Sequence, residues 1–243
     1  MELVTASTLP HALRTLELPA RRYLMVDGSG DPNASGFQDA LGALYPVAYA
    51  VKFASKNDLG RDYVVPPLEA LWWADELAVF TAQRDKSRWK WTLLSLVPDW
   101  IDAETVQSIL TAREAGAAAP VRLETLEEGL CVQTLHVGPF DDEGEILAEM
   151  HHAFPERAGH ILTGTHHEIS LSDLRRVPPE RQRTILRQPI RPAAPSPRSV
   201  AATETIVFDE EQSAKGRVSP DPEVYLRRAA RRFIETAEVT PGG

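Results

Sequence analysis

The chain has 243 residues, of which 43% are hydrophobic and 25% charged, as in a globular protein with one large or two small domains. Its formal net charge of −9 argues against a broad nucleic-acid-binding surface, which needs a basic field, so we expect no direct contact with nucleic acid. The single cysteine, Cys131, excludes an intrachain disulfide and favours a reducing, cytoplasmic location with the thiol buried in a core strand.

The sequence also lacks the pattern of a membrane span or a secretory signal. A membrane-spanning helix needs about 20 consecutive apolar residues, and no run approaches that length. The N-terminus is interrupted by Pro10 and has no cationic start followed by an apolar run. We predict that residues 1–19 form a short arm before the first folded element.

Residues 20–100 have the pattern of a strand, a turn, a helix and two strands. Apolar residues in the helix follow helical spacing, and Pro46 should kink or split it. Pro66 and Pro67 lack the N–H that a sheet needs, which places the second strand at an edge or a bulge. The predicted elements are the strand Arg21–Asp27, the turn Gly28–Asn33, the helix Phe37–Phe53 and the strands Tyr63–Trp73 and Trp89–Leu96. A helix Asp102–Ala115 follows, capped by Asp102 and stopped by Gly116.

The same order of elements returns between residues 128 and 190. A strand Gly129–His136 ends at a Gly-Pro turn, and the helix Asp141–Phe154 has acids in its first turn, as the helix dipole favours. Strands His166–Leu171 and Arg183–Ile190 complete the set. We therefore predict an α+β fold with duplicated β-α-β-β repeats, at about residues 20–100 and 128–190 of one domain.

Composition changes after Ile190. Residues 191–198 are a Pro/Ala/Ser linker, and residues 203–222 are polar and acidic, as in disordered segments. Residues 222–239 could form one helix with a rough apolar face flanked by arginines. That helix is either a solvated or loosely docked tail, or a partner- or membrane-surface helix. We expect residues 191–243 to be dispensable for folding.

Two stretches suggest a pocket, because each places one carboxylate in a strand. Alternation puts Glu69 with Tyr63 and Trp73 on one side of the first strand, and Trp89 with Trp91 on one side of the next. In the second half Glu168 shares a side with His166 and Ser170, while Ile169 and Leu171 should face the helices. Rings and carboxylates suit flat, hydrophobic or cationic ligands. The alternative is that the tryptophans belong to the core and Glu69 to the surface.

Other chemistries have weaker support. The adjacent pairs His151-His152 and His166-His167 lack a metal-binding spacing, and neighbours on a strand point to opposite faces, so we expect no metal and no cofactor. A triad of Ser170, His136 and Glu69 can be assembled on paper, but no GxSxG turn accompanies it. The turn at residues 28–33 lacks the Lys and the third glycine of nucleotide-binding loops.

Six ordered motifs resemble the stand-alone GyrI-like small-molecule-binding proteins over about residues 20–190. They are YLMVDGSGDPN, YVVPPLEALWW, WKWT followed by PDW, GLCVQTLHVGPFDDE, HHEISLSD and RTILRQPI. The resemblance implies an SHS2-like duplicated β-α-β-β fold with an antiparallel sheet and a ligand cleft between the repeats. Related domains form the effector-binding part of multidrug-responsive regulators, where a strand glutamate at the place of Glu168 contacts drugs. Some stand-alone members look like hydrolases that open the cyclopropane of DNA-alkylating natural products.

The sequence departs from the family pattern at two points of the pocket. The family pattern usually reads HHEIYLSDP, whereas Ser170 and Leu174 stand here, and Phe140 often aligns with a tyrosine. Each missing phenol removes a hydrogen-bond donor, which favours binding over hydrolysis. The expected ligand-binding residues are Tyr63, Glu69, Trp73, Trp89, Trp91, His136, Phe140, His166, Glu168 and Ser170.

Three functions follow from the resemblance. The first is binding of a small hydrophobic or cationic ligand. The second is a cyclopropane-opening hydrolase with Glu69 and Glu168 as the catalytic acids. The third is an effector-sensing partner of a transcription regulator. The oligomeric state stays open.

Overall fold

The structure is a computed structural model that describes residues 13–75, 85–113, 120–173 and 176–193. Residues 1–12 of the expected arm and the tail from residue 194 onward, including the predicted helix 222–239, lie outside the described residues. Within the described ranges, no helix is both long and apolar enough to cross a bilayer.

Nine strands form one large antiparallel sheet in which the two repeats meet edge to edge. The sheet path is β1-β6-β9-β8-β3-β4-β2-β5, and β7 pairs with β9 beside it. The strands are β1 (Arg14–Leu18), β2 (Arg21–Ser29), β3 (Glu69–Trp73), β4 (Lys90–Leu96), β5 (Arg122–Leu126), β6 (Gly129–Val137), β7 (His160–Leu162), β8 (His166–Ser170) and β9 (Arg183–Pro192). The order β6-β9-β8 in one repeat mirrors β2-β4-β3 in the other, so the β3–β8 pair is the junction of the repeats.

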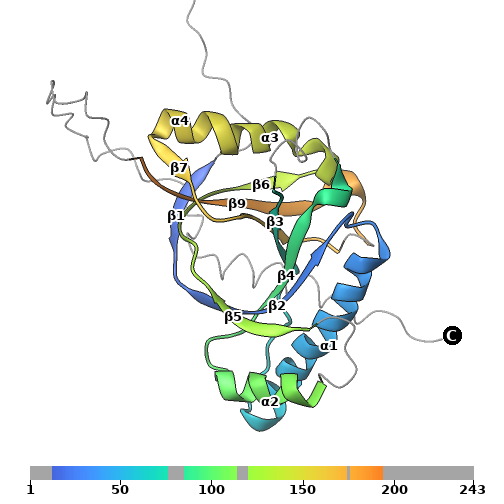
Figure 1. Ribbon diagram of the computed structural model, residues 1–243. Coiled ribbons are helices and arrows are strands. Elements are labelled where there is room, and N and C mark those ends of the chain that lie inside the picture. The colour runs from blue at the N-terminus through green and yellow to red at the C-terminus, as the bar shows by residue number, and fades with distance from the viewer. Residues whose placement is uncertain (1–12, 76–84, 114–119, 174–175, 194–243) are drawn as a thin grey trace, which may run out of the picture.

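The helices gather in two groups at opposite ends of the sheet (Figure 1). The first group is α1 (Ser35–Asp58) and α2 (Ala103–Arg113). The second is one continuous run of α3 (Gly144–Ala148), a π-helical turn η5 (Glu149–Ala153) and α4 (Phe154–Ala158). Short 3-10 turns are η2 (Lys86–Arg88), η4 (Phe140–Asp142) and η6 (Pro179–Arg181).

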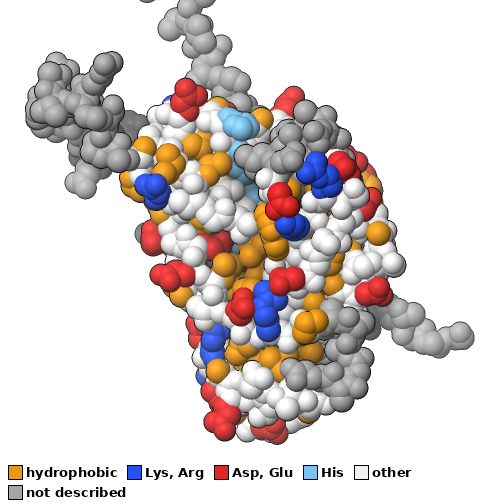
Figure 2. All heavy atoms as spheres, in the orientation of Figure 1, with side chains coloured by type: hydrophobic (Ala, Val, Ile, Leu, Met, Phe, Trp, Pro, Cys, Tyr) orange, Lys and Arg blue, Asp and Glu red, His pale blue; other side chains and the backbone are white. Residues whose placement is uncertain are grey.

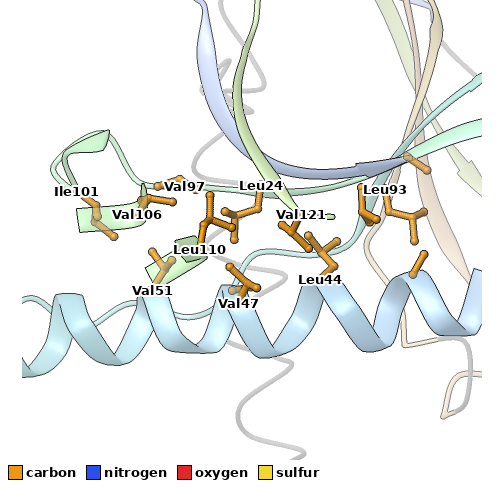
Figure 3. Packing of buried hydrophobic residues seen from close by; sticks show 14 of the residues in the cluster. Leu24, Leu44, Val47, Val51, Leu93, Val97, Ile101, Val106, Leu110 and Val121 are labelled. Carbon is orange, nitrogen blue, oxygen red and sulfur yellow. The ribbon is translucent and has the colours of Figure 1, made fainter. Parts of the chain in front are cut away.

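Both helix groups pack on the same face of the sheet, which we call the helix side. In the first repeat Leu44, Val47 and Val51 of α1 point toward Leu24 and Leu93 of the strands (Figure 3). In the second repeat the buried cluster consists of Val132, Ile146, Met150, Leu186 and Ile190. We call the opposite face the far side; there Tyr23, Met25, Leu71 and Leu94 form a third cluster.

Several element bounds differ from the sequence prediction. The helix α1 continues through Pro46 instead of splitting and runs on to Asp58. The predicted strand Tyr63–Trp73 pairs only from Glu69, because Pro66 and Pro67 cannot donate to a ladder. Residues 14–18, predicted as arm, form β1 and pair with β6.

The glycine at position 28 is required by packing. Gly28 lies opposite Trp91 on the helix side of the β2–β4 pair. A Cβ at this position would lie 1.9 Å from the Trp91 ring, so only glycine leaves room for the indole. Trp91 is 1% exposed and donates a hydrogen bond of 3.3 Å to the Gly30 carbonyl.

We predict that Gly28→Ala destabilises the protein by about 1–3 kcal/mol or more, because an overpacked core must shift. The control is Gly42→Ala on the exposed side of α1, where an added Cβ meets nothing within 4 Å. That change should stabilise the helix by about 0.5–1 kcal/mol. Urea unfolding measures both, and a Gly28→Ala protein as stable as the wild type would contradict the close contact.

Candidate functional site

The two expected acids lie on opposite faces of the sheet. In the β3–β8 pair Glu69 lies opposite Ile169, and Glu168 lies opposite Ala70. Residues directly opposite each other share a face, and an offset of one residue turns a side chain to the other face. Glu168 therefore faces the helix side with Ala70, whereas Glu69 faces the far side. The expectation that Glu69 and Glu168 line one pocket is wrong, as is the expectation that Ile169 faces the helices.

Glu69 belongs to a buried ionic network on the far side. His167, which is fully buried, lies between two carboxylates: its Nε2 is 3.0 Å from Glu69 and its Nδ1 is 2.9 Å from Glu128. The other oxygen of Glu128 accepts a hydrogen bond of 2.9 Å from Arg187 Nη1, and Arg187 Nε donates to Gln133 at 3.2 Å. The network joins β3 of the first repeat to β8 and β9 of the second.

The network favours the charged forms of His167 and Glu128 despite burial. Burial opposes the charged form of His167, but the hydrogen bonds to Glu128 and Glu69 raise its pKa. Burial alone would raise the pKa of Glu128, yet His167 and Arg187 lower it to about 2. Tyr23 packs edge-on against His167 with ring centroids 6.5 Å apart, and its pKa is well above the ordinary value because of burial and the Glu69 charge. Because Glu69, Glu128, His167 and Arg187 all have partners of opposite charge, we interpret the network as one that stabilises the fold.

On the helix side, aromatic rings cover the junction of the repeats. Trp72 of β3 stacks on Phe37 of α1 with ring centroids 6.2 Å apart, and Trp89 packs edge-on against Trp72 at 5.8 Å. The indole Nε1 of Trp72 is buried without a hydrogen-bond partner. Trp72 pairs with His166 across the junction, so the rings lie beside the polar residues of β8.

Those polar residues form a chain that leads to Glu168. The His166 Nε2 atom lies 3.6 Å from the Glu168 carboxylate, and its Nδ1 atom is 3.3 Å from Nε2 of His151. Burial and the neighbouring His166 lower the pKa of His151 to about 3, so His151 is neutral. His151 lies in the π-helical turn, a feature that often occurs at functional sites.

A second carboxyl, Glu143, approaches Glu168 from the start of α3. Glu143 is 3% exposed, and its Oε1 atom has no hydrogen-bond partner. Burial, the charge of Glu168 and the charge of Asp141 raise the pKa of Glu143 to about 9. Glu143 is therefore a neutral carboxylic acid at pH 7, beside Glu168. We call Trp72, Trp89, Glu143, His166 and Glu168 the β3–β8 site.

The other expected residues are divided between this site and the rest of the fold. Ser170 and His136 share the helix side with Glu168, and His136 is tied to the Pro139 carbonyl at 3.1 Å. Phe140 is 39% exposed in η4.

Three predicted pocket residues lie elsewhere. Trp91 is in the core, Trp73 lies on the far side, and Tyr63 packs edge-on against Trp100. The hypothetical triad of Ser170, His136 and Glu69 does not form, because Glu69 lies on the far side of the sheet and the other two residues lie on the helix side.

The surroundings of Trp89 are polar. A small pocket beside it is lined by Ser29, Ala74, Asp75, Ser87, Arg88, Trp89 and Lys90. Across it Lys90 donates a hydrogen bond of 2.6 Å to Asp75. Figure 2 shows one face of the molecule, where hydrophobic side chains reach the surface between acidic, basic and histidine groups. In the described ranges, no group of three or more His, Cys, Asp or Glu residues could hold a metal ion.

Comparison with known proteins gives the family. A family model, the GyrI-like small molecule binding domain, matches residues 11–191. The chain belongs to the GyrI-like family. The resemblance carried by the six motifs is thereby confirmed, and the α+β antiparallel sheet agrees with the GyrI-like fold.

Solved structures extend this comparison. An uncharacterized conserved protein from Listeria innocua is 37% identical, with 74% of this chain and 92% of that chain covered and a TM-score of 0.66. A protein described as a hydrolase from Listeria innocua is 36% identical, with 74% and 91% covered and a TM-score of 0.62. EcmrR in complex with DNA shares only the fold, at 12% identity, 75% and 58% coverage and a TM-score of 0.50. No curated protein matches the chain.

Sequence reasoning missed Trp72, Glu143 and the far-side network. Trp72 was not among the predicted pocket residues, because alternation was counted from Glu69 and Trp72 lies on the opposite face of the strand. Glu143 stands among four nearby acids, but its spacing to Ile146 and Met150 is that of one helix face, which marks it as inward-facing. No local pattern marks Glu128 and Arg187, because their partner His167 lies far away in the sequence.

We predict that Glu128→Gln destabilises the fold by about 3–5 kcal/mol, because it leaves Arg187 buried without its ion-pair partner. Its exposed neighbour Glu127 is the control, and Glu127→Gln should stay within about 0.5 kcal/mol of the wild type. Urea unfolding at neutral pH compares the two variants. Equal stabilities would show that the network contributes nothing.

The same network predicts an acid-side dependence. The pKa of Glu128 is lower in the folded protein, at about 2, than its ordinary value of 4.5. Its carboxylate therefore stabilises the fold above pH 4.5, and this contribution is lost as pH falls toward 2. The stability difference between Glu128→Gln and the wild type should shrink over that range in unfolding curves. A constant difference would contradict the ionised state of Glu128.

Proposed function

We propose that this GyrI-like domain binds flat hydrophobic small molecules that carry a positive charge, at the β3–β8 site. The observation that carries the proposal is that Glu168 and Trp72 lie on the helix side of the β3–β8 junction, where Trp89 packs against Trp72. Indole faces attract cations and stack on flat rings. A carboxylate beside them adds charge complementarity, which is stronger where water is partly excluded.

The charge balance of the site supports a cationic ligand. Among the described residues, no Lys or Arg forms an ion pair with Glu168 or Glu143; the group near Glu168 is His166, at 3.6 Å. On the far side of the same strands, by contrast, the carboxylates of Glu69 and Glu128 are paired with His167 and Arg187. A carboxylate that the protein leaves without a strong cation is suited to receive one from a ligand.

We predict that a planar cationic dye such as ethidium quenches tryptophan fluorescence on binding. Glu168→Gln should lower the affinity for the dye by about tenfold, because about 1.4 kcal/mol of charge pairing is lost. The exposed Glu180 in η6 provides the control, and Glu180→Gln should bind as the wild type does. Dye binding that Glu168→Gln leaves unchanged would place the ligand elsewhere, and no quenching by any cationic dye would count against the function.

A second candidate function uses the same site for hydrolysis of strained cyclopropanes. Two observations favour it: a solved structure described as a hydrolase is 36% identical to this chain, and the site pairs a protonated acid, Glu143, with Glu168. A buried carboxyl that keeps its proton is suited to the role of general acid, and a second carboxylate in the same site is suited to that of general base. The pair is Glu143 and Glu168, in place of Glu69 and Glu168.

The proposed step balances as an addition of water. The water oxygen bonds to a cyclopropane carbon while Glu168 accepts a proton from that water. The strained carbon–carbon bond of the substrate breaks. Its electron pair moves through the conjugated ring of the substrate to the carbonyl oxygen on that ring. Glu143 donates its proton to this oxygen, which becomes a phenol. Proton transfer from Glu168 to Glu143 restores the starting state.

We expect incubation with a cyclopropane-bearing DNA alkylator to yield a product with the mass of one added water. Glu143→Gln and Glu168→Gln should each slow turnover by about 10² to 10⁴-fold, the usual contribution of general acid–base catalysis. The exposed neighbour Glu145 is the control, and Glu145→Gln should be as active as the wild type. Unchanged compound at high protein concentration would leave binding as the function, and an active double glutamine variant would exclude these acids.

A further inference from the structure

Glu143 is a buried carboxyl of the β3–β8 site whose hydrogen-bonding capacity is not fully used. Its side chain is almost fully buried, and its Oε1 atom has no hydrogen-bond partner. It lies at the start of α3, where the preceding 3-10 turn ends. Burying a carboxyl without a partner is costly, and the cost is far greater for the ionised form. The position therefore favours a protonated Glu143 until a nearby positive charge stabilises the carboxylate form.

The charged groups around Glu143 do not supply that neutralisation. The charges that act on Glu143 come from Glu168 on β8 and Asp141 in η4, and both residues are acids. The nearby histidines are His166, whose Nε2 is 3.6 Å from Glu168, and His151, which is neutral. Lys86 of η2 lies 3.9 Å from Asp141, at the exposed outer end of the group. Among the described residues, the site thus has two carboxyls whose charges interact, and neither forms an ion pair with a Lys or Arg.

We infer that a permanent cation bound at the β3–β8 site expels the proton of Glu143, so that ligand binding and proton release are coupled. The inference rests on the proposed binding function and adds a feature to it. The cation brings the positive charge that the site lacks, and both carboxyls then remain ionised around it. A flat neutral compound brings no charge, so it leaves the proton in place.

The coupling follows from thermodynamic linkage. If the cation binds more tightly to the deprotonated site, raising pH must increase its affinity until the free site is itself deprotonated. The pKa of Glu143 in the free site is about 9. An adjacent opposite charge lowers a carboxyl pKa by about 1–3 units. We therefore expect the affinity for a cation to rise about five- to fiftyfold between pH 7 and pH 9.

The test is calorimetric titration of the full chain with ethidium, at pH 8 in two buffers of different ionisation enthalpy. The difference between the two heats counts the protons released, and we expect about half a proton or more per dye. Repeating the titration from pH 7 to pH 9 gives the change in affinity.

Variants separate Glu143 from its neighbours. Glu143→Gln should still bind ethidium, but with no proton release and an affinity that does not change with pH. Glu145→Gln, an exposed change two residues along, should retain both effects. Circular dichroism and urea unfolding check that each variant is folded. As a ligand control, a planar uncharged aromatic compound should bind the wild type without releasing protons.

The results of these titrations test the coupling to proton release separately from the proposed binding function. If no cation binds at any pH, the proposed function fails. If ethidium binds to the wild type with no proton release and equal affinity at pH 7 and pH 9, the function stands and the coupling is overturned. If Glu143→Gln keeps the pH dependence, another group carries the proton and the assignment to Glu143 is overturned.

Discussion

The contact between His167 and its two carboxylates is the interaction on which the arrangement of the repeats depends. It lies at the β3–β8 junction, where Glu69 comes from one repeat and Glu128 from the other. Removing one member of a buried ion group leaves an unpaired charge, which costs far more than a lost surface contact. The network therefore favours one register of the junction, because a shift by one residue would carry His167 to the other face.

The two faces of the junction treat charge in opposite ways. On the far side the carboxylates of Glu69 and Glu128 have cationic partners, and Arg187 completes the network. On the helix side Glu143 and Glu168 share their surroundings with rings and with a buried indole N–H that has no partner. Fully paired groups stabilise a fold, while groups left without partners are available to a ligand. The fold and the site thus occupy the two faces of the same strands.

Most of the fold could be predicted from the sequence, because apolar periodicity and turn residues mark β2, α1, β4, β6, β8 and β9 directly. The face of a strand was harder to assign. The polar residues His166, Glu168 and Ser170 were correctly grouped by alternation, but Glu69 was given the same face as its apparent counterpart. Register between distant strands decides that face, and a single sequence carries no local signal for it. The partners of His167 were missed for the same reason.

The adjacent residues His166 and His167 separate two kinds of constraint along one strand. His167 is fixed between two carboxylates in the interior, Glu69 and Glu128, while His166 contacts Glu168 and His151. Under the proposed function, substitutions at positions 166, 168 and 170 would alter ligand recognition, while residues 167 and 169 contribute to the fold. During evolution, such a strand can change its ligand specificity through substitutions at alternate positions while the protein still folds. A library randomised only at these three positions would therefore test new ligand specificities in a folded protein.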